Sequence, residues 1–243
     1  MNLKSVTAQA KVELLLTLRR GESVLLALGI PVLLLVFFAN VDVIPMEHTS
    51  SVDFLAPGML ALAVMSTAMV GLGIATGFER QYGVLKRLGS TPLGRPALLV
   101  AKTIGVLAVE ALQVMVLVAV ALVLGWDPAG MAVITAATAT LLATVAFAGL
   151  GLLMAGTLRG ETVLAAANGL YLVLLLLGGM VVPLGELPSG LRAVARLLPA
   201  AALSDALHGA FGAGASAPAR AWIVLVLWSA VAPVAAAITF KWE

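Results

Sequence analysis

Polar side chains inside long apolar segments are the residues of this sequence with the clearest capacity for chemistry. Glu110 and Gln113 are three residues apart in one apolar stretch, and Asn168 and Tyr171 have the same spacing in another. That spacing places both members of a pair on one face of a helix. Polar and charged groups in hydrocarbon are costly, and they indicate either function or a buried partner. Hydrogen bonding between helices is the favoured interpretation of Glu110 and Gln113, and helix packing is the favoured interpretation of Asn168 and Tyr171. The alternative is a substrate path or, for Glu110, a proton-linked group.

No motif for nucleotide binding or hydrolysis is present in the sequence. A phosphate-binding loop needs the pattern G-x-x-x-x-G-K-[ST], in which amides and a lysine surround the phosphates. The nearest match begins at Gly89 and has Arg95 and Pro96 in place of the lysine and the hydroxyl residue. H-E-x-x-H and G-x-S-x-G do not occur, there is no cysteine, and the two histidines are far apart. We therefore expect that this chain is not an enzyme and binds no metal or cofactor itself.

Composition places the chain in a membrane. Of its 243 residues, 62% are hydrophobic and 11% are charged, whereas soluble domains are about 25% charged. A soluble protein of this size cannot bury so much apolar surface. The net charge of +2 does not indicate a nucleic-acid partner. We expect an all-α, polytopic membrane protein that forms a single domain over residues 1–243.

Six segments are long and apolar enough to cross a bilayer as helices. They are residues 23–39, 54–78, 103–124, 131–154, 163–182 and 221–240. In the second segment Gly73 and Gly77 are four residues apart, a spacing typical of a face where two membrane helices pack closely. Residues 1–22 instead repeat apolar side chains every three to four positions, with basic residues between them. This pattern predicts an amphipathic helix at the membrane surface, in contact with lipid.

The distribution of basic residues predicts the orientation. Six spans put both termini on one side, and that side holds all but three of the 14 lysines and arginines. The exceptions are Arg192, Arg196 and Arg220. Because loops rich in Lys and Arg stay in the cytoplasm, we expect cytoplasmic N- and C-termini in a multi-pass protein of the inner (plasma) membrane.

Two connecting segments stand out by length. Residues 79–102, on the cytoplasmic side, begin with charges and then carry Leu85 and Leu88, which predicts a short amphipathic helix; a solvated basic linker is the alternative from composition alone. Residues 183–220, on the external side, are interrupted by prolines and contain a short apolar stripe around Leu191 and Leu198. This second pattern predicts a re-entrant helical hairpin, with a half-helix that dips back toward the membrane.

The cytoplasmic segment also carries a family resemblance. From Glu79 to Arg95 it reads E-R-x-x-G-x-L-x-x-L-x-x-T-P-L-x-R, and Lys102 follows. This string resembles the cytoplasmic loop of type-2 ABC exporter permeases of the daunorubicin and multidrug-resistance branch, with departures at Gln81 and Val84. The run from Gly178 to Pro183 is similar to the end of the family's fifth span. The strings Leu187-Pro188, Leu198-Pro199 and Asp205-Ala206-Leu207 are similar to the external region that follows it.

The resemblance implies a division of labour between subunits. This chain would be one of two membrane halves of an exporter for drug-like, lipid or other amphiphilic substrates. It would pair with a second copy or a related permease, above a separate ATPase that binds ATP and Mg²⁺. The external region would gate the exit, with Pro183, Pro188, Pro199 and Asp205 as candidates. The short cytoplasmic helix would be the coupling helix, seated in the ATPase, and its candidate residues are Glu79, Arg80, Gly83, Leu85, Lys86, Arg87 and Leu88.

Individual side chains of the coupling helix can be given roles. We expect Lys86 and Arg87 to pair with acidic residues of the ATPase, and Leu85 and Leu88 to supply apolar anchors. Two other functions stay open. Glu110 is compatible with a stand-alone ion-coupled carrier or channel, and an intramembrane enzyme is disfavoured because no catalytic constellation occurs.

Overall fold

The structure, a computed structural model, describes residues 3–19, 21–41, 51–89, 95–128, 132–212 and 216–240. Within these ranges the regular structure is helical and contains no strand, which confirms the all-α expectation. Five helical stretches are long and apolar enough to cross a membrane: Ser51–Gln81, Val100–Val123, Val133–Thr157, Gly160–Leu177 and Ala219–Thr239. They correspond to the second to sixth predicted spans.

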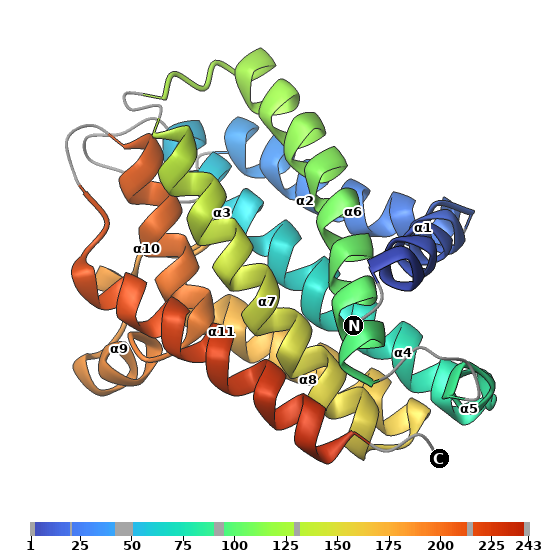
Figure 1. The fold of residues 1–243 in the computed structure, drawn as a ribbon. Coiled ribbons are helices and arrows are strands. Elements are labelled where there is room, and N and C mark those ends of the chain that lie inside the picture. Colours follow the sequence, from blue (N-terminus) through green and yellow to red (C-terminus); the bar gives the residue numbers. More distant parts are fainter. Residues whose placement is uncertain are drawn as a thin grey trace.

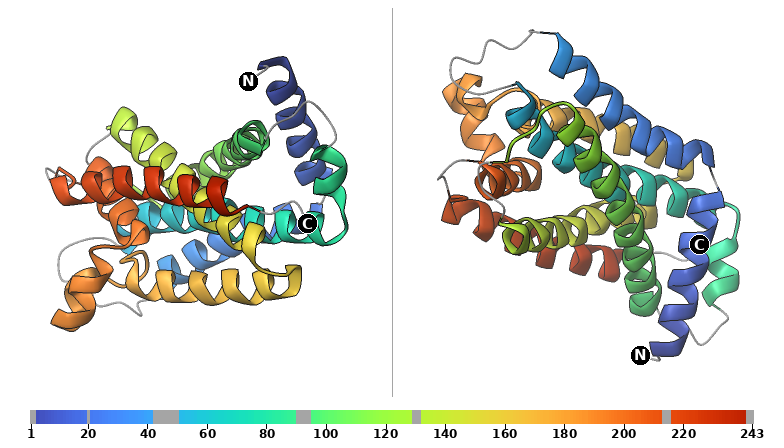
Figure 2. Two further views of the ribbon diagram at one scale, coloured as in Figure 1. Left: turned by 60° about the horizontal axis from the view of Figure 1, so that its bottom comes forward. Right: turned by 90° about the horizontal axis from the view of Figure 1, so that it is seen from above.

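The first predicted span, residues 23–39, lies in α2 (Gly21–Asn40). Its apolar stretch, Ala27–Asn40, is shorter than the other five, so the count of six spans stays a prediction. The N-terminal helix α1 (Leu3–Arg19) precedes it. Figure 2 shows α1 turning sharply away from α2 and lying across one end of the bundle. On α1, Ala10 is buried while Val12, Leu15 and Leu16 are exposed; its place at the membrane surface stays a prediction.

The centre of the bundle is a single continuous helical stretch made of three parts. They are α3 (Ser51–Met65), a π-helical segment (Ser66–Gly71) and α4 (Leu72–Gln81). Nearly every residue of α3 from Val52 onward is buried. A π-helical turn inserts one residue into the α-helical register and is frequent at functional sites. Here it changes which side chains face the neighbouring helices in the middle of the bundle.

Helices α6 (Arg95–Val123), α7 (Val133–Thr157) and α8 (Gly160–Leu177) pack against this central stretch, and α11 (Ala219–Thr239) packs against α7 and α10 (Pro199–Phe211). The most extensive packing is between α7 and α11, which lie side by side in Figure 1. Small residues also permit close packing of α4 against its neighbours. A Cβ atom on Gly73 would lie 3.1 Å from the backbone of Gly151 on α7, and one on Gly77 would lie 3.1 Å from Val163 on α8. The predicted packing role of Gly73 and Gly77 is therefore confirmed.

Two helices differ in extent from the predicted segments. α6 begins at Arg95, so Lys102 lies two turns inside it rather than at its head; the buried residues Ala97, Leu98 and Ala101 extend the helix in that direction. α8 ends at Leu177, short of the predicted residue 182. The chain turns there through Gly179, whose φ of +67° is readily adopted by glycine.

The connection between α8 and α11 contains a 3-10 turn (Leu184–Glu186), α9 (Ser189–Ala195) and α10 (Pro199–Phe211). α10 is largely buried and packs against α3, α7 and α11. On α9, Leu191 and Val194 are exposed. The two helices match the predicted helical character of residues 183–220, whereas their re-entry into the membrane stays a prediction.

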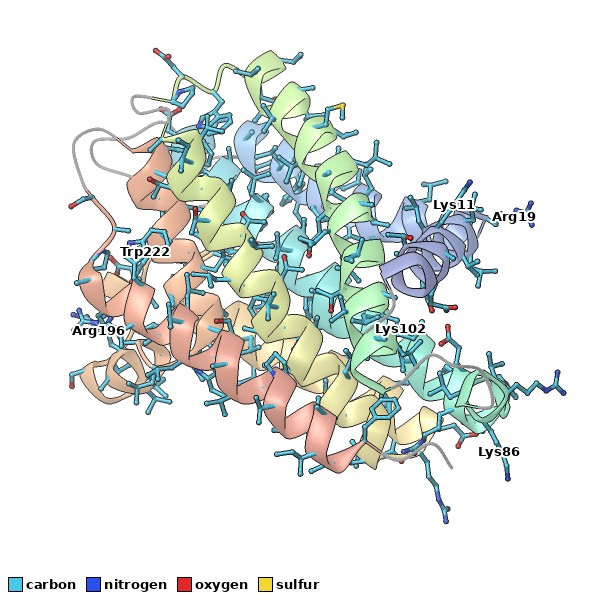
Figure 3. All side chains as sticks on the ribbon, viewed as in Figure 1. Lys11, Arg19, Lys86, Lys102, Arg196 and Trp222 are labelled. Atoms are coloured by element: carbon cyan, nitrogen blue, oxygen red, sulfur yellow. The ribbon has the colours of Figure 1, made fainter. Side chains whose placement is uncertain are left out.

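The two ends of the bundle have different contents. Figure 1 shows α1, α5 (Val84–Gly89) and the C-terminal end of α11 at one end, with α9 and α10 at the other. Lys11, Arg19 and Lys86 lie at the first end and Arg196 at the second, as labelled in Figure 3. The fold thus separates the basic residues as the orientation argument requires, although it does not itself identify the cytoplasmic side.

Candidate functional site

A cavity of about 730 Å³ lies between α1, α2, the π-helical segment, α4, α6 and α8. Most of its lining side chains are apolar, contributed by α2, α4 and α6. Ser66 and Thr67 come from the π-helical segment, and Asn168 and Tyr171 come from α8. A concave, mainly apolar space with a few polar groups is the usual form of a small-molecule site.

Asn168 and Tyr171 are the two predicted pathway residues that the structure places on this cavity. The Asn168 amide nitrogen donates to the carbonyl of Leu164 in its own helix at 2.8 Å, so its side-chain oxygen remains available as an acceptor. Tyr171 is half-buried. Both residues are on the wall formed by α8, as their spacing predicts, and their pathway role stays a prediction.

Gln113 does not line the cavity, because both ends of its side-chain amide bind neighbouring helices. Its nitrogen donates to the carbonyl of Ala27 on α2 at 2.9 Å, and its oxygen accepts from the Thr67 hydroxyl at 2.8 Å. These bonds join α2, the π-helical segment and α6. Gln113 therefore makes hydrogen bonds between helices, which is the interpretation that the sequence favours.

Glu110 is likewise not among the residues that line the cavity and is 2% exposed. Its Oε2 lies 2.6 Å from the Thr144 hydroxyl on α7. The same hydroxyl is 2.8 Å from the carbonyl of Thr140. Among the described residues, Oε1 of Glu110 has no hydrogen-bond partner. Glu110 therefore links α6 to α7, and the structure gives it no direct opening to the cavity.

Glu79 and Arg80, which open the family string, both point into the protein. Glu79 Oε2 lies 2.6 Å from the Lys102 ammonium. The Arg80 guanidinium donates to the carbonyl of Gly156 at 2.6 Å and to that of Leu158, at the end of α7. A cation that binds the last carbonyls of a helix caps it and compensates its dipole. These two residues hold α4 against α6 and α7.

The helix α5 follows a tight turn after α4. Gly83 has a φ of +71°, a backbone conformation that residues other than glycine rarely adopt. The turn therefore explains why the family string has a glycine at this position. Tyr82, Val84, Lys86 and Arg87 are exposed around the turn and helix. Lys86 faces away from the bundle at the end where α1 lies, as Figure 3 shows, whereas Tyr82 and Val84 also line the cavity.

Leu85 differs from its predicted role as an exposed anchor. Its side chain is fully buried and joins the protein's own hydrophobic core. α5 turns this side chain inward, while the adjacent Val84 is 42% exposed. The Leu88 side chain and residues 90–94, which complete the predicted loop, lie outside the described part of the chain.

Prolines mark the helix starts at the opposite end of the bundle. Pro183 and Pro188 directly precede the 3-10 turn and α9, and Pro199 is the first residue of α10. Asp205 forms a 2.6 Å ion pair with Arg220. Burial raises the pKa of Asp205 above its ordinary value, and the Arg220 guanidinium opposes that rise. Together these features fasten α10 to the start of α11.

The sequence analysis did not predict one ionic cluster, which is centred on Lys102. Lys102 lies 3.0 Å from Glu13 of α1 as well as 2.6 Å from Glu79 of α4. Its side chain is 1% exposed, and all three residues line the cavity. The sequence did carry a signal of this cluster, namely a lysine close to an apolar span. A lysine that becomes buried there needs an acidic partner. Which of the acidic residues would supply it depended on the arrangement of the helices.

Comparisons with known proteins agree with this architecture. Residues 5–211 match the profile of the family described as "ABC-2 type transporter". The chain is also similar to the "Putative transport permease YvfS" of Bacillus subtilis (strain 168), with 26% identity over 201 residues that cover 79% of each chain. These matches identify the family, but they do not show to which branch of it the chain belongs.

Proposed function

The chain belongs to the ABC-2 type transporter family, and from this premise we propose that it is the membrane permease subunit of an ATP-driven exporter. A separate subunit binds ATP and Mg²⁺ and hydrolyses the nucleotide. The observation that carries the proposal is the placement of a large, mainly apolar cavity next to a short helix with exposed basic residues. A transport subunit driven by a partner needs both features, a substrate compartment and a docking surface.

The lining of the cavity favours an amphiphilic substrate. Apolar side chains of α2, α4 and α6 suit a lipophilic body, and burying that surface drives binding. Asn168, Tyr171 and Thr67 supply hydrogen-bonding groups that orient a polar part. Drug-like compounds and lipids both have this composition. The multidrug-resistance branch rests on the string from Glu79 to Arg95, which is the finer part of this proposal.

The proposed docking surface is the exposed face of α4 and α5, with Tyr82, Val84, Lys86 and Arg87. Basic side chains pair with acidic residues on a partner and speed its association. Glu79, Arg80, Gly83 and Leu85 contribute indirectly, because they fix the position of this face on the bundle. The assembly is completed by a second copy or a related permease in the plasma membrane, with cytoplasmic termini.

Reconstitution tests this function. The chain and its ATPase, placed together in proteoliposomes, should move a fluorescent amphiphile when ATP and Mg²⁺ are supplied. Lys86→Glu with Arg87→Glu should abolish stimulation of the ATPase, whereas Arg196→Glu, at the other end of the bundle, should leave it unchanged. Tyr171→Leu should alter transport and spare ATPase binding. Transport by the chain alone, without ATP, would establish the ion-coupled carrier instead.

A further inference from the structure

Lys102 is the one fully buried lysine or arginine among the described side chains, and it is shared by two carboxylates from different elements. Glu79 belongs to the central helical stretch, whereas Glu13 belongs to α1 at the edge of the bundle. Figure 3 shows Lys102 between α1 and the region of α4 and α5. A single ion pair would have balanced the charge, so the second carboxylate needs an explanation of its own.

Sharing allows α1 to separate at low cost. A buried cation without a counter-ion is strongly destabilising, but Lys102 keeps Glu79 at 2.6 Å when Glu13 leaves. Glu13 also keeps a partner, because Gln9 of the same helix donates to it at 2.8 Å. Neither charge is therefore stranded when the contact between Glu13 and Lys102 opens.

The contact lies where α1 forms part of the cavity wall. Glu13 and Leu16 of α1 line the cavity, as do Lys102, Gly105 and Val106 of the neighbouring helix α6. Gly105 brings the two helices together, since a Cβ atom at that position would lie 3.1 Å from the Cβ atom of Glu13. The outer side of α1 exposes Val12 and Leu15, so its inward face is the one that closes the cavity.

The same cluster adjoins the proposed docking surface. Glu79 is three residues before Tyr82, at which the chain turns into α5. A displacement of α5 by the ATPase therefore moves Glu79 relative to Lys102, and this changes how strongly Lys102 holds Glu13. We propose that α1 is a movable wall of the cavity, latched by the Glu13–Lys102–Glu79 cluster and released for substrate entry. This inference rests on the proposed function.

A disulfide can replace the latch with a covalent lock. The chain has no cysteine, so Glu13→Cys with Gly105→Cys introduces a single pair. Its Cβ atoms start 3.1 Å apart, so α1 and α6 need to separate by a few tenths of an ångström to reach the roughly 3.5–4.5 Å of a disulfide. In proteoliposomes with the ATPase, oxidation should stop transport and a reductant should restore it. Each single variant should be insensitive to oxidant. Unchanged transport by the cross-linked protein, or failure of the cysteines to cross-link, would overturn the proposal.

A second measurement uses the permease alone and is independent of transport. Ala75 lines the cavity, and we expect Ala75→Cys to react with a maleimide more slowly once the disulfide has formed. Glu13→Gln should speed this reaction, because it removes the ion pair that holds α1. It should change Tm little, because Lys102 keeps its ion pair with Glu79. Lys102→Met should lower Tm, because two partly buried carboxylates then lose the cation between them. If Glu13→Gln leaves the labelling rate unchanged, the cluster is a static ion pair and α1 is no latch.

The two measurements separate the possible failures. Wild-type protein that shows no ATP-dependent transport contradicts the proposed function, yet the labelling experiment still tests the latch. Wild-type protein that transports, together with labelling that ignores both the disulfide and Glu13→Gln, contradicts the latch and leaves the proposed function standing.

Discussion

At the scale of single residues, the polar groups inside the membrane helices divide by what they contact. Asn168 and Tyr171 face the cavity, while Glu110 and Gln113 bind neighbouring helices. Both pairs have the same spacing in the sequence, and spacing fixes only the shared face of a helix. Whether that face meets a cavity or another helix depends on which neighbour is packed against it.

Glu110 gives a prediction at this scale. Glu110→Gln should preserve the packing, because the glutamine amide donates to the Thr144 hydroxyl while that hydroxyl donates to the Thr140 carbonyl. Glu110→Ala should lower Tm, because it removes the contact and leaves a cavity, at a cost of about 2–4 kcal/mol. Thermal unfolding in detergent checks both variants. A changed substrate range in Glu110→Gln, at normal stability, would contradict a purely structural role.

At the scale of elements, α4 and α5 show how one short string serves two purposes. Glu79, Arg80 and Leu85 are directed into the bundle and position the segment. Val84, Lys86 and Arg87 are exposed, and they belong to the proposed docking surface. A helix of six residues is too short for its apolar periodicity to reveal which side is buried. The sequence alone therefore predicted that Leu85 faces a partner, whereas it faces the core.

Neighbouring positions on α5 make a matched pair for testing this. Leu85→Asp should lower Tm severely, because it buries a carboxylate that has no partner in the core. Val84→Asp should leave Tm nearly unchanged and reduce stimulation of the ATPase, because Val84 is exposed. The two variants change adjacent residues to the same side chain, and Tm and ATPase rate are measured for each. Equal effects on Tm would mean that α5 does not present these faces.

At the scale of the whole molecule, the fold separates charges between two ends. Lys11, Arg19 and Lys86 lie at the end with α1, and Arg196 lies at the end with α9 (Figure 3). Hydrophobic helices cross the region between the two ends, where Glu110 and Lys102 have partners inside the bundle. This separation agrees with the positive-inside rule and makes the orientation testable.

Cysteine labelling checks the orientation directly, because the natural chain has no cysteine. In intact cells, a membrane-impermeant maleimide should label Arg196→Cys and should not label Lys86→Cys. After permeabilisation it should label both, since both positions are exposed. The reverse pattern in intact cells would place α5 outside and exclude docking of a cytoplasmic ATPase.

The sequence by itself determined the membrane class, the helical character, the second to sixth apolar segments and the family string, because hydropathy and motif are local properties of the chain. The tertiary structure decided which polar residues share a cavity, that Leu85 is buried, and that Lys102 joins Glu13 and Glu79. Glu13 and Lys102 are 89 residues apart, and no local pattern specifies such a pairing. It arises only when α1 packs against α6, where Gly105 lets the two helices meet.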